Sequence, residues 1–173
     1  MIIVFTGNGK GKTTAALGQA IRAIGNGSKV LMVEFIKGPW KSGEDAFAKK
    51  ISQDLKIVKK GKGFVRIMNN TVPFEEHVSA AHDALYYASR EVQEKKWNIL
   101  ILDEVWVALS LKLITMAEVL SCIDAAEKCC DHIILTGRGC PKEFFDRADL
   151  VTEMKEIKHP FSSGSPGTKG VEY

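Results

Sequence analysis

Residues 2–14, with the sequence IIVFTGNGKGKTT, decide the fold. Ile2–Phe5 is a continuous apolar run that suits a buried strand, and Thr13–Ile24 carries apolar residues at helical spacing. A glycine-rich turn from a buried strand into a helix is the setting of a phosphate-binding loop, because inward-facing N–H groups and the helix N-terminus attract anions. We therefore expect nucleotide phosphates to bind Gly7, Asn8, Gly9, Lys10, Gly11, Lys12, Thr13 and Thr14.

Within this loop, Lys12 is expected to reach the phosphates and the hydroxyl of Thr13 to ligate Mg²⁺. The usual pattern G-x-x-x-x-G-K-[ST] is not met in full, because Thr6 stands at its first glycine position. A loop that only turns a strand into a helix is the alternative interpretation.

The rest of the chain repeats the alternation of strand and helix. Further strands are predicted at Val30–Ile36, Ile99–Leu102 and Ile133–Leu135, and further helices at Pro73–Trp97, Ala117–Ala126 and Pro141–Arg147. Strands separated by helices predict an open, mostly parallel sheet with helices on both faces. We expect an α/β, P-loop NTPase-like (RecA-like) single domain over residues 1–157, followed by a tail over residues 158–173.

Composition excludes several other classes of protein. The 173 residues are 45% hydrophobic and 26% charged, which is typical of one globular domain, and no apolar run is long enough to cross a membrane. The net charge of +3 is too small to indicate nucleic-acid binding. Lys49–Arg66 holds seven basic residues against one acid, and we favour a solvated surface there over a nucleic-acid patch, with an anionic small molecule nearby as another option. Four cysteines without metal-type spacing and the lack of a charged leader favour the cytoplasm.

Two more predicted strands end in residues that suit nucleotide chemistry. Asp103 and Glu104 follow Ile99–Leu102, where carboxylates can hold a nucleotide's Mg²⁺ directly or through water. In a chain without a phosphate loop, such a pair of carboxylates is more often a charge pair at a helix N-terminus. The phosphate loop is the feature that makes a metal site the favoured interpretation here. Arg138 lies in the glycine-flanked turn TGRG and can clamp a triphosphate oxygen or simply face solvent.

Several segments together resemble the ATP:corrinoid adenosyltransferases of the cobalamin pathway. The similar segments are the phosphate loop, FIKGPW at 35–40, LDE at 102–104, TGRG at 136–139, KHPF at 158–161 and GVEY at 170–173, in the family's order. The resemblance runs from residue 2 to the last residue. Composition alone describes residues 158–173 as a frayed terminus, whereas the resemblance implies a tail packed on or near the active site.

The resemblance implies transfer of the 5′-deoxyadenosyl group of ATP to the cobalt of a reduced corrinoid, with release of triphosphate. It assigns catalytic roles to Lys12, Arg138 and Glu104, and an Mg²⁺ or Mn²⁺ site to Thr13, Asp103 and Glu104. It also implies a flavoprotein electron donor and a homodimer. The corrinoid is expected to contact Trp40, Phe64 and Arg66; the family's Gly-Phe-Thr-Trp segment reads GFVR here, at 63–66.

Two other functions fit the phosphate loop. One is an ATPase controlled by a nucleic-acid or protein partner, and the other is a small-molecule kinase. The products distinguish the three reactions, because only adenosyl transfer releases triphosphate. Neither alternative explains the two C-terminal motifs.

Overall fold

The protein is described by a computed structural model that covers residues 1–65, 71–160, 168, 170 and 171. Its centre is a six-stranded sheet in which every pairing is parallel and the strand order is β3-β2-β4-β5-β1-β6. The strands are β1 (Ile2–Thr6), β2 (Val30–Glu34), β3 (Leu55–Lys59), β4 (Ile99–Asp103), β5 (His132–Thr136) and β6 (Leu150–Glu153).

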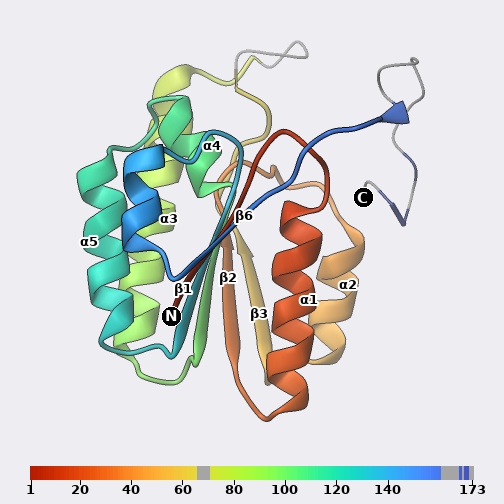
Figure 1. Ribbon diagram of the computed structural model, residues 1–173, viewed down its shortest axis with the longest axis vertical. Coiled ribbons are helices and arrows are strands. Elements are labelled where there is room, and N and C mark those ends of the chain that lie inside the picture. Colours follow the sequence, from red (N-terminus) through yellow and green to blue (C-terminus); the bar gives the residue numbers. More distant parts are fainter. Residues whose placement is uncertain (66–70, 161–167, 169, 172–173) are drawn as a thin grey trace.

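Helices cover both faces of this sheet. As Figure 1 shows, α1 and α2 lie on one face and α3, α4 and α5 on the other. The helices are α1 (Lys12–Gly25), α2 (Gly43–Lys50), α3 (Phe74–Gln93), α4 (Val105–Ser110) and α5 (Met116–Glu127), with a short 3₁₀ helix, η1, at Lys142–Arg147. Among the described residues, no helix is both long and apolar enough to cross a membrane.

Apart from polar residues at their ends, the central strands are apolar because each of their faces packs against a layer of helices. Val4 and Leu102 belong to a core cluster with residues of α3, α4 and α5. Phe5 and Ile101, each one residue away along its strand, belong to a second cluster with Ala16 and Ala20 of α1 and Ala48 of α2. Each large aliphatic side chain buried in this way contributes about 1.5–3 kcal/mol.

The predicted α/β class with a parallel sheet is confirmed. The strand predicted over Val30–Ile36 ends earlier, at Glu34. Phe35 and Ile36 are also apolar and buried, but they lie in the loop that follows, so the apolar pattern made the predicted strand too long. The helix predicted over Pro73–Trp97 ends at Gln93, since Lys95 has a left-handed φ of 54° that no α-helix continues.

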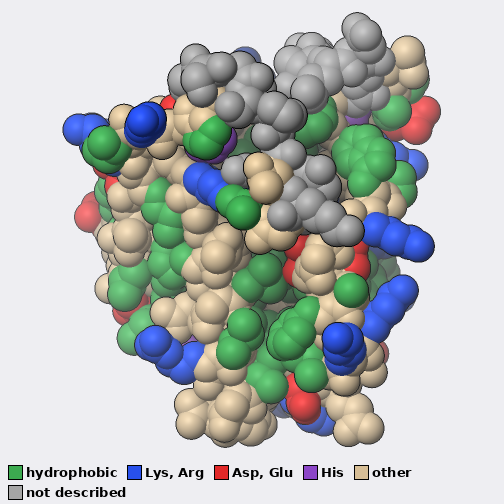
Figure 2. All heavy atoms as spheres, turned by 90° about the vertical axis from the view of Figure 1, so that its right-hand side faces the viewer, with side chains coloured by type: hydrophobic (Ala, Val, Ile, Leu, Met, Phe, Trp, Pro, Cys, Tyr) green, Lys and Arg blue, Asp and Glu red, His purple; other side chains and the backbone are tan. Residues whose placement is uncertain are grey.

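The basic stretch is not simply a solvated surface. Part of it forms β3, an edge strand that pairs with β2, and Lys59 at the end of β3 faces a pocket. Figure 2 shows the face covered by α1 and α2, where Lys and Arg side chains line the right-hand rim and a group of acidic side chains lies further inward.

Parallel strands bring their carboxyl ends to one edge of the sheet, at the top in Figure 1. β5 separates β1, which leads into the phosphate loop, from β4, which ends at Asp103. The loops after β1, β2, β4 and β5 therefore meet at this edge, where ligands of open α/β sheets bind.

Candidate active site

The phosphate loop turns sharply between β1 and α1. Gly7 and Gly11 have φ values of 94° and 112°, in the left-handed region that favours glycine. Gly9 lies so close to the chain after β6 that a Cβ atom there would stand 2.8 Å from the Met154 carbonyl oxygen, and its N–H donates to that oxygen at 2.7 Å. The loop conformation therefore depends on glycine and on its contact with residue 154.

Lys12, the first residue of α1, folds back over this loop. Its Nζ donates to the carbonyl oxygens of Gly7 at 2.8 Å and of Gly9 at 2.6 Å. Burial lowers the pKa of Lys12, and the positive charge of Arg138 lowers it further, against the effect of Glu104 and other acids. Arg138 therefore belongs to the electrostatic surroundings of Lys12.

Asp103 lies at the centre of a hydrogen-bonded group beneath the loop. Its Oδ1 accepts from the hydroxyl of Thr13 at 2.9 Å and from that of Thr136 at 2.7 Å. Thr136, at the end of β5, also accepts from the N–H of Glu104 at 2.9 Å. The motif TGRG begins with Thr136, but we predicted no role for this residue. Its position at a strand end beside Gly137 was the signal from which a role in the site could have been inferred.

The other oxygen of Asp103, Oδ2, is buried without a hydrogen-bond partner. It forms an ion pair with the Nζ of Lys37, at 3.7 Å. The hydroxyl of Thr13 and the carboxylates of Asp103 and Glu104 offer only oxygen ligands, which suit Mg²⁺ or Mn²⁺. No cluster of three or more His, Cys, Asp or Glu side chains with metal-site geometry occurs in the described ranges 1–65 and 71–160.

Glu104 has an unusual backbone for a residue that is not glycine. Its φ of 61° and ψ of 22° are left-handed, and they turn the chain from β4 into α4. Burial and, to a smaller extent, the charge of Asp103 raise the pKa of Glu104 to about 7, against the effect of Lys37. The carboxyl group lines a pocket while still acting electrostatically on Lys12.

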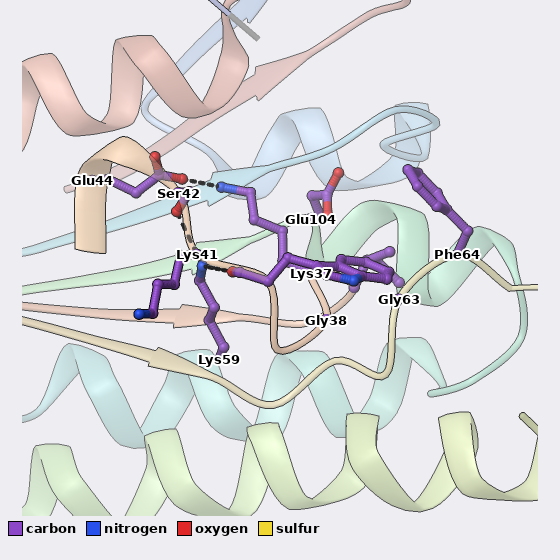
Figure 3. A pocket seen from close by; sticks show the side chains of 11 residues that line it. Lys37, Gly38, Lys41, Ser42, Glu44, Lys59, Gly63, Phe64 and Glu104 are labelled. Atoms are coloured by element: carbon purple, nitrogen blue, oxygen red, sulfur yellow. Dashed lines mark hydrogen bonds and ion pairs between the residues drawn. The ribbon is translucent and has the colours of Figure 1, made fainter. Parts of the chain in front are cut away.

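That pocket has a volume of about 260 Å³ and lies beside the phosphate site (Figure 3). The rings of Trp40 and Phe64 lie in its wall with centroids 6.2 Å apart, and the two residues are 61% and 48% exposed. Gly38 and Gly63 hold the indole of Trp40, because a Cβ atom on either would stand 2.8 or 2.5 Å from a ring carbon. The pocket therefore presents exposed aromatic surface to a ligand.

Charged side chains close the other side of the pocket. The Nζ of Lys37 lies 2.7 Å from a carboxylate oxygen of Glu34 and 2.7 Å from one of Glu44. Burial raises the pKa of Glu34 to about 7 against the effect of Lys37. Lys37 is part of the motif FIKGPW, but we predicted no role for it from the sequence. Glu34 and Glu44 belong to no motif from which a role could have been predicted.

The predicted site residues thus fall into two neighbouring groups. Thr13, Asp103, Glu104 and Arg138 gather around the phosphate loop, whereas Trp40 and Phe64 line the pocket. Arg66 lies outside the described residues. Burial raises the pKa of the Cys140 thiol to about 12, which does not favour a nucleophilic thiolate there.

The fold and the loop define a phosphate-loop nucleotide-binding protein of the α/β class. One structural relative, the flagellar accessory protein FlaH from Methanocaldococcus jannaschii, superimposes with a TM-score of 0.56 at 11% identity. The match covers 88% of this chain and 69% of FlaH, and it supports the fold.

Sequence comparison defines the family. The family described as ATP:corrinoid adenosyltransferase BtuR/CobO/CobP matches residues 1–173. The corrinoid adenosyltransferase of Escherichia coli K12 is 34% identical over 173 residues, which are 100% of this chain and 85% of the relative. Corrinoid adenosyltransferase CobA of Salmonella typhimurium LT2 is 35% identical over 175 residues with the same coverage. The chain belongs to the ATP:corrinoid adenosyltransferase family, and the resemblance seen in its motifs is confirmed.

Proposed function

We propose that this protein transfers the 5′-deoxyadenosyl group of ATP to the cobalt of a reduced corrinoid and releases triphosphate. The observation that carries the proposal is the position of Glu104. Its side chain lines the aromatic pocket, and its N–H donates to Thr136, which together with Thr13 of the phosphate loop donates to Asp103 Oδ1. A nucleotide held by the loop and a flat, apolar ligand held by the pocket would be neighbours. Membership of the family supports both substrates.

In this reaction the cobalt(I) centre of the substrate is itself the nucleophile. Its electron pair forms the Co–C5′ bond, the C5′–O bond breaks, and the triphosphate leaves with that bond's electrons. The chemistry needs no side chain as a base, so the protein's task is to hold the leaving group and align C5′ with cobalt.

Lys12, Arg138 and the loop N–H groups would stabilise the charge of the departing triphosphate. Thr13, Asp103 and Glu104 would hold Mg²⁺ or Mn²⁺, and the buried Oδ2 of Asp103, which accepts no hydrogen bond, supports that assignment. When bound, the ion would supply further positive charge against the triphosphate.

Trp40 and Phe64 are proposed to contact the corrinoid, because their exposed rings lie side by side in the pocket. Arg66 would join them from the segment after residue 65. We also propose the cytoplasm as the site of action, on the ground that the four cysteines are unpaired. The flavoprotein donor and the homodimer stay predictions from the family.

An anaerobic assay with ATP, Mg²⁺ and chemically reduced cobalamin tests the proposal. The corrinoid spectrum should change to that of the adenosylated form, with one triphosphate released per turnover. Formation of ADP and phosphate without any change in the corrinoid would show an ATPase instead. ADP with a phosphorylated acceptor would show a kinase.

A further inference from the structure

Lys37 contacts carboxylates from three different elements. Its Nζ lies 2.7 Å from Glu34 Oε1 at the end of β2, 2.7 Å from Glu44 Oε1 in α2, and 3.7 Å from Asp103 Oδ2 at the end of β4. Figure 3 shows its side chain directed toward Glu44. One ammonium group therefore connects the sheet edge beneath the phosphate loop with the helix beside the aromatic pocket.

Two of these carboxylates would otherwise repel each other. Glu34 and Asp103 face each other in register on adjacent strands, and neither side chain is exposed to solvent. Buried like charges interact strongly because little water screens them. The charge of Lys37 lies close to both, so it allows Asp103 to keep the position in which it accepts from Thr13 and Thr136.

Lys37 also belongs to the segment that carries the aromatic wall. Gly38, the next residue, is one of the two glycines against which the Trp40 indole packs. The ion pair with Glu44 ties this segment to the first turn of α2. Loss of the lysine would thus release the loop that holds Trp40.

We propose that Lys37 is a positioning residue for adenosyl transfer, which fixes Asp103 on the nucleotide side and the Trp40 loop on the corrinoid side at the same time. The proposal rests on the proposed function, because it takes Asp103 as part of the metal–nucleotide site. It predicts that a single substitution at Lys37 disturbs both the nucleotide site and the corrinoid site.

Lys59 provides a matched control in the same pocket. Its Nζ donates to the Trp40 carbonyl oxygen at 2.8 Å, to Ser42 Oγ at 3.0 Å and to Asp45 Oδ2 at 2.6 Å. These three partners belong to the Trp40 loop and α2, and Asp103 is not among them. Substitution of Lys59 should disturb the aromatic wall without disturbing the nucleotide site.

The experiment compares Lys37→Met and Lys59→Met with the wild type in two binding measurements. Calorimetry gives the Kd of Mn²⁺·ATP, and acrylamide quenching of tryptophan fluorescence reports on Trp40, because Trp97 and Trp106 are only 7% and 0% exposed. Lys37→Met should weaken Mn²⁺·ATP binding by roughly 10–100-fold, as loss of a group that orients a metal ligand does. It should also change the quenching. Lys59→Met should change the quenching alone.

The double variant Glu34→Gln/Lys37→Met guards against a folding defect, since it removes one buried charge of each sign. It should recover Mn²⁺·ATP binding, because Asp103 is no longer repelled by Glu34, while the quenching stays altered. Wild-type quenching in the double variant would overturn the link to the Trp40 loop. Unchanged or tighter Mn²⁺·ATP binding by Lys37→Met would overturn the role toward Asp103. A wild type that binds Mn²⁺·ATP but alkylates no corrinoid would instead contradict the proposed function.

Discussion

Lys12 combines two properties that suit a residue acting on a leaving group. It is held over the phosphate loop by hydrogen bonds to Gly7 and Gly9, and it lies near Arg138 in a partly buried setting. In such a setting a positive charge stabilises a developing negative charge more strongly than it would in water.

Lys12→Ala should therefore lower kcat for adenosyl transfer by roughly 10²–10³-fold, the usual effect of losing one preorganised charge-stabilising group. Lys128→Ala, at the end of α5, removes the same charge from a distant position and should leave kcat unchanged. Anaerobic kinetics with both variants check the prediction. Wild-type turnover by Lys12→Ala would rule out the phosphate-loop assignment.

Glu34 makes the protein's stability depend on pH. Its folded-state pKa of about 7 lies above the ordinary value of 4.5, so between these values the folded state binds more protons than the unfolded state. Stability from this carboxyl is therefore fully present at low pH and is lost as the pH rises through 7.

In metal-free buffer, the wild type should lose on the order of 2–3 kcal/mol of unfolding free energy relative to Glu34→Gln between pH 4.5 and pH 8. Urea unfolding of both proteins across this range measures the difference. A difference that does not vary with pH would show that the carboxyl titrates normally.

At the scale of elements, the loops after β2 and β3 meet around one indole. Gly38 comes from the first loop and Gly63 from the second, and both leave room for Trp40. Gly63 also has a φ of 98°, which a residue with a side chain adopts only with strain.

Gly63→Ala should displace Trp40 and raise the KM for the corrinoid by about tenfold, the order expected when a packed contact worth ~1.4 kcal/mol is lost. The KM for ATP should not change. Gly27→Ala is the matched control, because Gly27 has a similar φ of 82° but no atom within 4 Å of the added Cβ. Steady-state kinetics of both variants separate the effect of the lost Trp40 contact from that of backbone strain. An equal rise of the corrinoid KM in both variants would contradict a specific role of the contact.

The strands that could be predicted from the sequence are those buried on both faces of the sheet. β4 is buried at all five positions, and its apolar run was sufficient to predict a strand. β3 and β6 were missed because they are edge strands, with lysines in β3 and mostly exposed residues in β6. Helix α2 was missed because it buries only Ala48.

For the site, local motifs indicated the residues beneath the phosphate loop. The contacts of Lys37 could not be predicted, since its partners Glu34, Glu44 and Asp103 come from three elements whose meeting depends on strand order. The side-by-side position of Trp40 and Phe64 likewise depends on the pairing of β2 with β3, which no single segment encodes.

In the molecule as a whole, the chain after β6 runs beside the phosphate loop. Met154 accepts from Gly9, and the charge of Glu156 raises the pKa of Lys12. The buried hydrophobic residues of the described chain, by contrast, all come before residue 145. The tail that begins at Lys158 therefore starts near the site but outside the core.

Deletion of residues 158–173 should greatly reduce adenosyl transfer yet keep the thermal unfolding midpoint close to that of the wild type. Deletion of residues 170–173 alone tests the last motif separately. Thermal scans and anaerobic assays of both truncations give the answer. Full activity after the longer deletion would show that the tail is not part of the site.

The position of β1 within the sheet also bears on how the chain folds during synthesis. β1 leaves the ribosome before the other five strands of the described sheet, but its partners in that sheet are β5 and β6, which begin at residues 132 and 150. Pairings so distant in sequence form slowly and leave apolar edges open in the meantime. The nascent chain must therefore carry its nucleotide loop on a strand that has no partner until β5 has been made, and it can complete the sheet only after β6 has been made, at residue 153.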